Sequence, residues 1–267
     1  MKNHNRPQNA SAKKPLRAAS PSAAPRRMVR LAIPQGEWLY GQHAVQAALR
    51  NPEREILALF ATHQAVEDLP TLPRGLRPTL VERSQLDTAL DGAVHQGILC
   101  VAKPLPELDV DDIVRAVGDK GLVVLLDQVT DPHNVGAILR SAAVFGATAV
   151  VMTERHAPQH MGTLAKSASG ALEKVALVRV VNLARTIEEL HKADFWVLGL
   201  AEGGTTMPAA PLPPKIALVM GAEGEGLRRL TKEKCDALAA LPTSDSFSTL
   251  NVSNAAAVAL YHLFANR

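Results

Sequence analysis

The chain has 267 residues, 47% of them hydrophobic, and a formal net charge of only +3, so it is long enough to bury the core of one large domain or two small ones. No apolar run approaches the roughly 18 residues of a transmembrane helix, so no membrane span is expected. The only two cysteines, Cys100 and Cys235, form no Cys-x-x-Cys pair, which argues against a zinc site and for a reducing, cytoplasmic compartment.

The charge is unevenly distributed. Residues 1–30 carry eight Lys or Arg and no acid, about +8, which leaves about −5 for the rest of the chain. Residues 1–35 are predicted to form a disordered basic tail, because their Pro, Ser, Ala and Asn content cannot bury a core. Three interpretations stay open: a nucleic-acid-binding arm, a solubilising tail, or an organelle transit peptide, which the prolines disfavour.

Residues 36–102 are predicted to form a small α/β domain, followed by a proline-rich linker at residues 103–108. His43 and His95 have no partner at metal-ligand spacing, so structural or RNA-facing roles are favoured and no metal is expected. In chain order we expect a turn at 39–41 that opens a helix, a strand at 56–61, a second strand at 79–81, a short helix at 84–90 with Ser84 as its cap, and a last strand at 98–102.

From residue 109 to residue 267 strands and helices alternate. Such alternation predicts a mostly parallel sheet with helices on both faces, whose ligands bind at the carboxyl ends of the strands. Strands are expected at residues 122–126, 149–152, 175–181, 195–200, 216–220 and 237–241, and helices at residues 113–117, 134–145, 162–170, 183–191, 227–234 and 253–265.

The first informative strand-end loop lies within residues 127–145. Asn134 is predicted to be the helix N-cap. Gly136 falls in the first helical turn, where it costs about 1 kcal/mol relative to Ala and permits close approach of backbone or ligand. Arg140 lies off the apolar stripe of the helix. Taken alone, these features also suit an ordinary capped helix with a surface arginine.

Two further strand-end loops follow. Residues 221–226 hold three glycines and expose backbone N–H groups beside a helix start, which suits a nucleotide-like ligand. They lack the dinucleotide and phosphate-loop fingerprints, which disfavours a dehydrogenase. Residues 242–253 are rich in hydroxyl groups and precede a helix whose small residues favour close helix packing: Ala255, Ala256 and Ala259.

Together, three motifs closely resemble those of the SpoU/TrmH family of RNA ribose methyltransferases, in the same order: Asn134-x-Gly-x-x-x-Arg140, Gly221-x-Glu-x-x-Gly226 and Leu250-Asn-Val-Ser253. The resemblance covers residues 109–267 in detail. The segments at 40–45 and 91–97 resemble the branch of this family that methylates a guanosine 2′-hydroxyl in large-subunit ribosomal RNA.

The resemblance implies an enzyme that uses S-adenosylmethionine as cofactor and RNA as partner. It implies a SPOUT fold, in which the C-terminal segment of the sheet domain forms a trefoil knot; the alternation alone predicts an ordinary doubly wound sheet. It also implies a homodimer packed through the first-motif helix and the last helix, which the alanines fit, and an RNA-binding N-terminal domain. The implied cofactor residues lie in strand-end loops: Leu200, Gly221, Glu223, Gly226, Leu241 and Leu250.

The resemblance also assigns the catalytic residues Arg140, Asn134, Glu223, Asn251 and Ser253. Arg140 is often taken as the base in this family. A guanidinium has a pKa above 12, so we prefer a role in binding the neighbouring phosphate and stabilising the developing oxyanion. Asn134 is expected to position Arg140 or the ribose, and Glu223 and Asn251 to orient the loops. Ser253 either contacts RNA or caps the last helix.

Two alternatives stay open. The first is the same chemistry on transfer RNA or on another ribosomal site. A non-catalytic RNA-binding assembly factor with this fold is disfavoured, because Arg140, Glu223 and Asn251 are all present.

Overall fold

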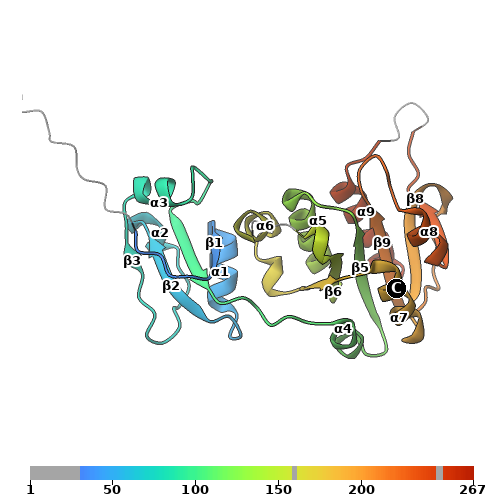
Figure 1. Ribbon diagram of the computed structural model, residues 1–267, viewed down its shortest axis with the longest axis horizontal. Helices are drawn as coiled ribbons and strands as arrows, with labels where there is room; N and C mark the ends of the chain where they lie inside the picture. The colour runs from blue at the N-terminus through green and yellow to red at the C-terminus, as the bar shows by residue number, and fades with distance from the viewer. Residues whose placement is uncertain (1–30, 158–160, 245–248) are drawn as a thin grey trace, which may run out of the picture.

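The computed structural model describes residues 31–157, 161–244 and 249–267, so most of the predicted tail lies outside the described residues. The molecule has two sheets, separated by helices and joined by an extended segment at residues 103–109 (Figure 1). No helix within the described ranges has both the length and the apolar content needed to cross a membrane. One buried hydrophobic cluster runs through both sheets, so the two halves share part of their core.

The N-terminal sheet has the strand order β1-β4-β2-β3. Its strands are β1 (Glu37–Tyr40), β2 (Ile56–Ala61), β3 (Thr79–Leu80) and β4 (Ile98–Ala102), and its helices are α1 (Gln42–Arg50), α2 (His63–Glu67) and α3 (Arg83–Ala89). Strand β1, which pairs with β4, takes the place of the turn expected at residues 39–41, and α2 was not expected. The predicted cap of α3 is also wrong: the cap is Glu82, whose N–H donates to Gln85 Oε1 at 2.8 Å.

The C-terminal sheet confirms the prediction of a mostly parallel sheet. All its strand pairs are parallel, in the order β10-β8-β9-β5-β6-β7. Its strands are β5 (Gly121–Asp127), β6 (Ala149–Thr153), β7 (Ala176–Val180), β8 (Trp196–Thr206), β9 (Lys215–Gly221) and β10 (Ala237–Ala240). The chain leaves β5 for β6 on one side while β9 lies on the other, so the topological switch point, where such sheets bind ligands, falls between β5 and β9.

Helices cover both faces of this sheet. One face carries α4 (Val110–Val117), α7 (Leu183–Lys192) and α8 (Arg229–Lys234), and the other carries α5 (Pro132–Val144), α6 (Met161–Ala168) and α9 (Val252–Ala265). Each face has its own buried cluster of aliphatic side chains, to which alternate residues of the strands contribute. The two faces nevertheless differ, because one of them carries α6, which packs against β1 of the N-terminal sheet.

Helix α6 and the turn that follows it pack closely against β1 and α1. A Cβ atom on Gly162 would lie 2.4 Å from Tyr40 Cε1, and one on Gly170 would lie 2.6 Å from Ala47 Cβ. The Tyr40 hydroxyl is 3.1 Å from Thr163 Oγ1. These two glycines, one in α6 and one just after it, therefore let the N-terminal domain pack closely on this part of the chain.

A buried polar cluster joins the two domains beside this contact; we call Glu37, Asn51, Arg54 and Glu173 the junction cluster. Arg54 Nη1 donates to Glu37 Oε2 at 3.0 Å and to the Lys103 carbonyl at 2.8 Å, and Arg54 Nη2 lies 3.0 Å from Glu173 Oε1. Asn51 Nδ2 donates to Glu173 Oε2 at 2.7 Å. The side chains of Arg54 and Glu173 are 1% and 3% exposed. One guanidinium thus binds β1, the start of the linker and the C-terminal domain.

His95 closes the loop before β4. Its side chain is buried; Nδ1 accepts the Gly97 N–H at 3.0 Å, and Nε2 lies 2.9 Å from Asp87 Oδ1. These contacts give His95 a structural role, whereas His43 is exposed on α1. The described residues hold no group of three or more His, Cys, Asp or Glu that fits a metal ion.

Candidate active site

The first-motif helix starts earlier than predicted. Helix α5 begins at Pro132, and its N-cap is Asp131, whose Oδ1 accepts the His133 N–H at 3.1 Å. Proline suits the first helical position because its missing N–H would have no helical partner there. Asn134 is therefore not the cap. It lies in the first turn, where its side chain is available for contacts with other loops.

Gly136 allows another element to approach α5 closely, as predicted, and that element is α6. A Cβ atom at this position would lie 2.5 Å from Ser167 Cβ and 2.9 Å from the Ala168 nitrogen. On the solvent side of the same contact, His133 Nδ1 is 3.1 Å from Ser167 Oγ. The start of α5 is thus fixed against the helix that carries the N-terminal domain.

The glycine loop, residues 221–226, folds back on itself at the end of β9. The Gly226 N–H donates to the Ala222 carbonyl at 2.9 Å, and a Cβ on Gly221 would lie 2.2 Å from the Gly226 carbonyl carbon. Gly224 and Gly226 have φ of 81° and 67°, values that favour glycine. The loop therefore presents backbone rather than side chains over most of its length.

Asp127 anchors the chain that follows the glycine loop, and sequence reasoning missed it. The carboxylate is fully buried at the end of β5; it accepts the Arg228 N–H at 3.0 Å and Arg228 Nε at 2.6 Å. The available signal was an acidic residue that ends an otherwise apolar strand, since a buried carboxylate requires a cationic or N–H partner. Arg228, two residues beyond the loop, supplies both.

Side chains from all three strand-end loops meet; we call Asn134, Glu223 and Asn251 the motif cluster. Asn134 Nδ2 donates to Glu223 Oε1 at 3.1 Å, and Asn251 Nδ2 donates to Asn134 Oδ1 at 3.1 Å. Asn251 Nδ2 also donates to Glu223 Oε1, which accepts the Val252 N–H at 3.3 Å as well. Glu223 is thus the common acceptor that holds the loops together.

Asn251, not Ser253, caps the last helix. Its Oδ1 accepts the Ser253 N–H at 2.9 Å and the Ser253 hydroxyl at 2.6 Å. The hydroxyl of Ser253 therefore supports the cap from inside the first turn, close to the motif cluster.

Arg140 is exposed on α5 and makes no hydrogen bond or ion pair with the described residues. One turn further on, Val144 opens an exposed apolar surface that continues onto α9; we call Val144, Val258, Tyr261 and Phe264 the aromatic face. Phe145 packs beneath it, with ring centroids 5.9 Å from Tyr261 and 6.0 Å from Phe264. Ala256 and Ala259, expected to pack between chains, are instead fully buried within this chain.

The residues expected to bind the cofactor lie within β8, in the glycine loop after β9, directly after β10 and next to the start of α9. Leu200 is not in a loop as expected: β8 continues to Thr206, and its pairing with β10 jumps from Gly199 to Thr205. Leu200 begins this bulge, where the ladder with β9 ends. Leu200 and Leu241 are partly buried against the core and Leu250 is exposed, while residues 245–248 lie outside the described ranges.

Neither the cavity at the domain junction nor the one at the carboxyl ends of β5, β6 and β7 is lined by these leucines. The first has a volume of about 1420 Å³. The second has a volume of about 450 Å³, and we call it the β5–β7 cavity. Arg155 and Arg228 line it, and sequence reasoning singled out neither residue.

Comparisons with known proteins agree with this geometry. Residues 121–261 match the SpoU rRNA methylase family, and residues 38–108 match the RNA 2'-O ribose methyltransferase substrate-binding family. The chain is 44% identical over 245 residues to the 23S rRNA (guanosine-2'-O-)-methyltransferase RlmB of Salmonella typhimurium, covering 86% of this chain and 99% of that protein. Its identity to the RlmB of Escherichia coli is 43%, with the same coverage.

Solved structures give the same fold. A putative RNA methyltransferase of the TrmH family from Porphyromonas gingivalis superposes with a TM-score of 0.69 at 26% identity, over 85% of this chain and 88% of that one. The SpoU methyltransferase AviRb from Streptomyces viridochromogenes, solved in complex with the cofactor AdoMet, superposes with a TM-score of 0.72 at 24% identity, over 85% of this chain and 89% of that one.

Proposed function

Because the chain belongs to the SpoU rRNA methylase family, we propose that it methylates the 2′-hydroxyl of a guanosine in large-subunit ribosomal RNA, with S-adenosylmethionine as methyl donor. The observation that carries the proposal is the meeting of the three motifs in the motif cluster. The substrate follows the relatives named as 23S rRNA guanosine-2'-O-methyltransferases, whose length this chain matches almost completely.

The residues present fit the cofactor. The glycine loop offers main-chain groups without side-chain obstruction, and the apolar side chains of Leu200, Leu241 and Leu250 suit the adenine ring. Gly221, Glu223 and Gly226 shape the loop that would hold it. When bound, S-adenosylmethionine supplies a methyl group on a positively charged sulfur. That charge disappears during transfer, so apolar walls favour the reaction.

Arg140 is the catalytic residue of the proposal. Its side chain is exposed, and no ion pair with a described residue occupies its guanidinium, so the five N–H donors are available to an anion. It binds the phosphate next to the target ribose and stabilises the oxyanion that forms as the 2′-hydroxyl loses its proton. Asn134, Glu223 and Asn251 act as positioning residues, and Ser253 supports Asn251.

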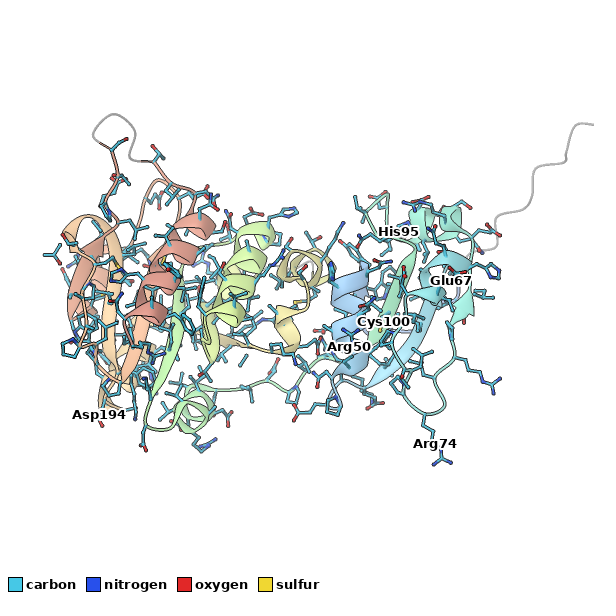
Figure 2. The ribbon with its side chains drawn as sticks, turned by 180° about the vertical axis from the view of Figure 1, so that it is seen from behind. Arg50, Glu67, Arg74, His95, Cys100 and Asp194 are labelled. Atoms are coloured by element: carbon cyan, nitrogen blue, oxygen red, sulfur yellow. The ribbon has the colours of Figure 1, made fainter. Side chains whose placement is uncertain are left out.

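The domain organisation and the location in the cell are also proposed from the family. Residues 36–102 form the substrate-binding domain, residues 103–108 the linker and residues 109–267 the methyltransferase domain of a cytoplasmic protein. In support of an RNA-binding role, the loop that contains His95 lies toward the molecular edge opposite Asp194, which precedes β8 (Figure 2). It therefore lies on the side of the strands' carboxyl ends, as does the motif cluster.

A trefoil knot in the C-terminal segment is part of the proposal. Strand β10 pairs with β8, whereas α9, the next helix in the chain, packs against α5 and β9. Just before α9, Asn251 and Val252 bond to Glu223, which follows the end of β9. The chain thus goes from the sheet edge at β10 to the ends of the central strands, which supports the proposal of a threaded segment.

A homodimer is proposed as well, packed through α5 and α9. The aromatic face gathers four large side chains that are 48–66% exposed, and such patches mark association surfaces. A second copy on this face would place its own residues beside Arg140, one turn from Val144. RNA would then contact both chains.

The test measures transfer of labelled methyl from S-adenosylmethionine to protein-free large-subunit rRNA from an unmodified strain. Transfer RNA serves as the alternative substrate. Label that maps to a 2′-O-methylguanosine in rRNA is the expected result. Arg140→Ala should lose turnover and keep cofactor binding, whereas Arg115→Ala on α4 should behave as wild type. Label only in transfer RNA would overturn the substrate, and normal methylation by Arg140→Ala would overturn the role of Arg140.

A further inference from the structure

The β5–β7 cavity lies beside the proposed active site on the sheet face that carries α7 and α8. Gln128, the residue after the anchor Asp127, forms one part of its wall, and Arg228 forms another. Arg228 is two residues beyond Gly226, so the glycine loop has the motif cluster at one end and this cavity at the other. The cavity also adjoins the topological switch point between β5 and β9.

Two arginine side chains in the cavity have N–H donors that no described residue uses. Arg228 gives its backbone N–H and Nε to Asp127, and its two terminal nitrogens have no hydrogen-bond partner among the described residues. Arg155 is exposed and has no hydrogen bond or ion pair within the described ranges. Among the residues that the structure describes, no Asp or Glu lines the cavity. Two guanidinium groups with free N–H donors suit a phosphate.

The same cavity exposes apolar surface. Val181 is 84% exposed and Leu230 is 47% exposed, and both line the cavity together with the buried Leu183. A volume of about 450 Å³ falls within the range of small-molecule sites and suits one nucleotide. Apolar walls beside a pair of arginines match a nucleobase attached to a phosphodiester better than they match a bare anion.

We propose that the β5–β7 cavity binds a nucleotide of the RNA substrate other than the one that is methylated. Arg155 and Arg228 hold its phosphate, and Leu230 and Val181 pack against its base. This inference rests on the proposed function, in which RNA is the substrate. It adds a contact on the α7 and α8 side of the sheet, away from Arg140, so the RNA strand lies across the glycine loop rather than on α5 alone.

The test compares Arg155→Ala and Leu230→Ala with a matched control, Arg229→Ala, in the full-length protein. Arg229 is adjacent to both Arg228 and Leu230 in the chain, is exposed, pairs with Glu233 and does not line the cavity. Both test residues are exposed, so the variants should fold. We expect the KM for rRNA to rise about tenfold in each test variant, with kcat and cofactor binding unchanged. Arg155→Ala should also reduce the salt dependence of RNA binding by about one counterion.

Two further readouts separate the possible failures. RNA affinity is measured directly by filter binding, so the cavity is tested even if the wild-type protein methylates no rRNA, a result that would overturn the proposed function alone. Equal RNA affinity and equal KM for Arg155→Ala, Leu230→Ala and Arg229→Ala would overturn the cavity proposal. So would micromolar binding of a free nucleoside monophosphate that Arg155→Ala abolishes without any change in RNA affinity, because the ligand would then be a free nucleotide.

Discussion

The junction cluster and the motif cluster are both polar hubs that join distant parts of the chain, and they differ in burial. At the junction, the buried guanidinium of Arg54 donates to two carboxylates and a carbonyl. At the strand ends, the exposed carboxylate of Glu223 accepts from two amide side chains and a backbone N–H. Water can replace a lost hydrogen-bond partner at the exposed motif cluster, but it does so poorly at the buried junction cluster.

The difference separates stability from activity. Removing one partner of a buried ion pair leaves an uncompensated charge, which is strongly destabilising. Removing an exposed acceptor costs little stability, but it releases the loops that position Arg140 and the proposed cofactor site. We therefore expect the junction cluster to dominate unfolding and the motif cluster to dominate turnover. The predictions below run from the largest to the smallest expected change in the free energy of unfolding.

Arg54→Ala should lower the free energy of unfolding by about 3–5 kcal/mol, because Glu37 and Glu173 lose their shared cation in a buried place. Chemical denaturation measures the change. Arg50→Ala, at the exposed end of the neighbouring helix α1, is the control and should change stability by less than about 0.5 kcal/mol. Equal stability of the two variants would remove the distinction between the hubs.

Gly136→Ala should lower the free energy of unfolding by about 1–3 kcal/mol, because the added methyl group overpacks the contact with Ser167 and Ala168. It also displaces α5 from α6, so activity should fall together with stability. Thermal unfolding and methylation are measured on the same sample. Ser141→Ala, on the same helix, is the control; a fully stable Gly136→Ala would show that α6 can move away without cost.

Glu223→Ala should cost only about 1–2 kcal/mol of stability, because the freed amides of Asn134 and Asn251 can bond to water. Turnover should nevertheless fall about 100-fold, as expected when reacting groups shift by about 1 Å. Glu223→Gln keeps an acceptor oxygen and should recover part of the activity. If the loss of turnover were explained by an equally large loss of stability, the motif cluster would be a structural hub like the junction cluster.

The smallest effect concerns the thiol of Cys100, which lies near Arg54 and Glu173. Burial raises the pKa of Cys100 to about 12, so the thiol stays protonated and should react slowly with thiol reagents at pH 8. The raised pKa adds stability that is complete below the ordinary value near 9 and is lost as the pH rises toward 12. Labelling should quicken in Arg54→Ala; an unchanged rate would mean that the junction stays closed without its cation.

The motif cluster was within reach of sequence reasoning, whereas the junction cluster was not. Asn134, Glu223 and Asn251 each follow an apolar strand, and the carboxyl ends of parallel strands share one edge. Glu37 and Glu173 lie 17 and 119 residues from Arg54, with no periodicity to connect them. Only the three-dimensional packing of α6 against β1 brings these residues together.

The errors in predicted elements have local causes. The start of α5 was placed at Asn134 because asparagine is a strong cap, but Asp131 followed by proline is stronger. The sequence pattern predicts that β8 ends at Leu200, yet a bulge lets the strand continue to Thr206. The alanines of α9 fit an interface between chains, but Ala256 and Ala259 are buried within the chain, so small side chains alone do not identify their partner.

The glycines around α6 make this helix a spacer of nearly fixed thickness. Gly136 admits α6 on one side, and Gly162 and Gly170 admit the N-terminal domain on the other, so neither separation leaves room for an added Cβ atom. Side-chain substitutions elsewhere can adjust a packed distance in small steps, but at these contacts the smallest residue is already in place. The separation between the N-terminal domain and α5, which carries Arg140, is therefore difficult to shorten, and in the proposed function it would set the span of RNA held between the two.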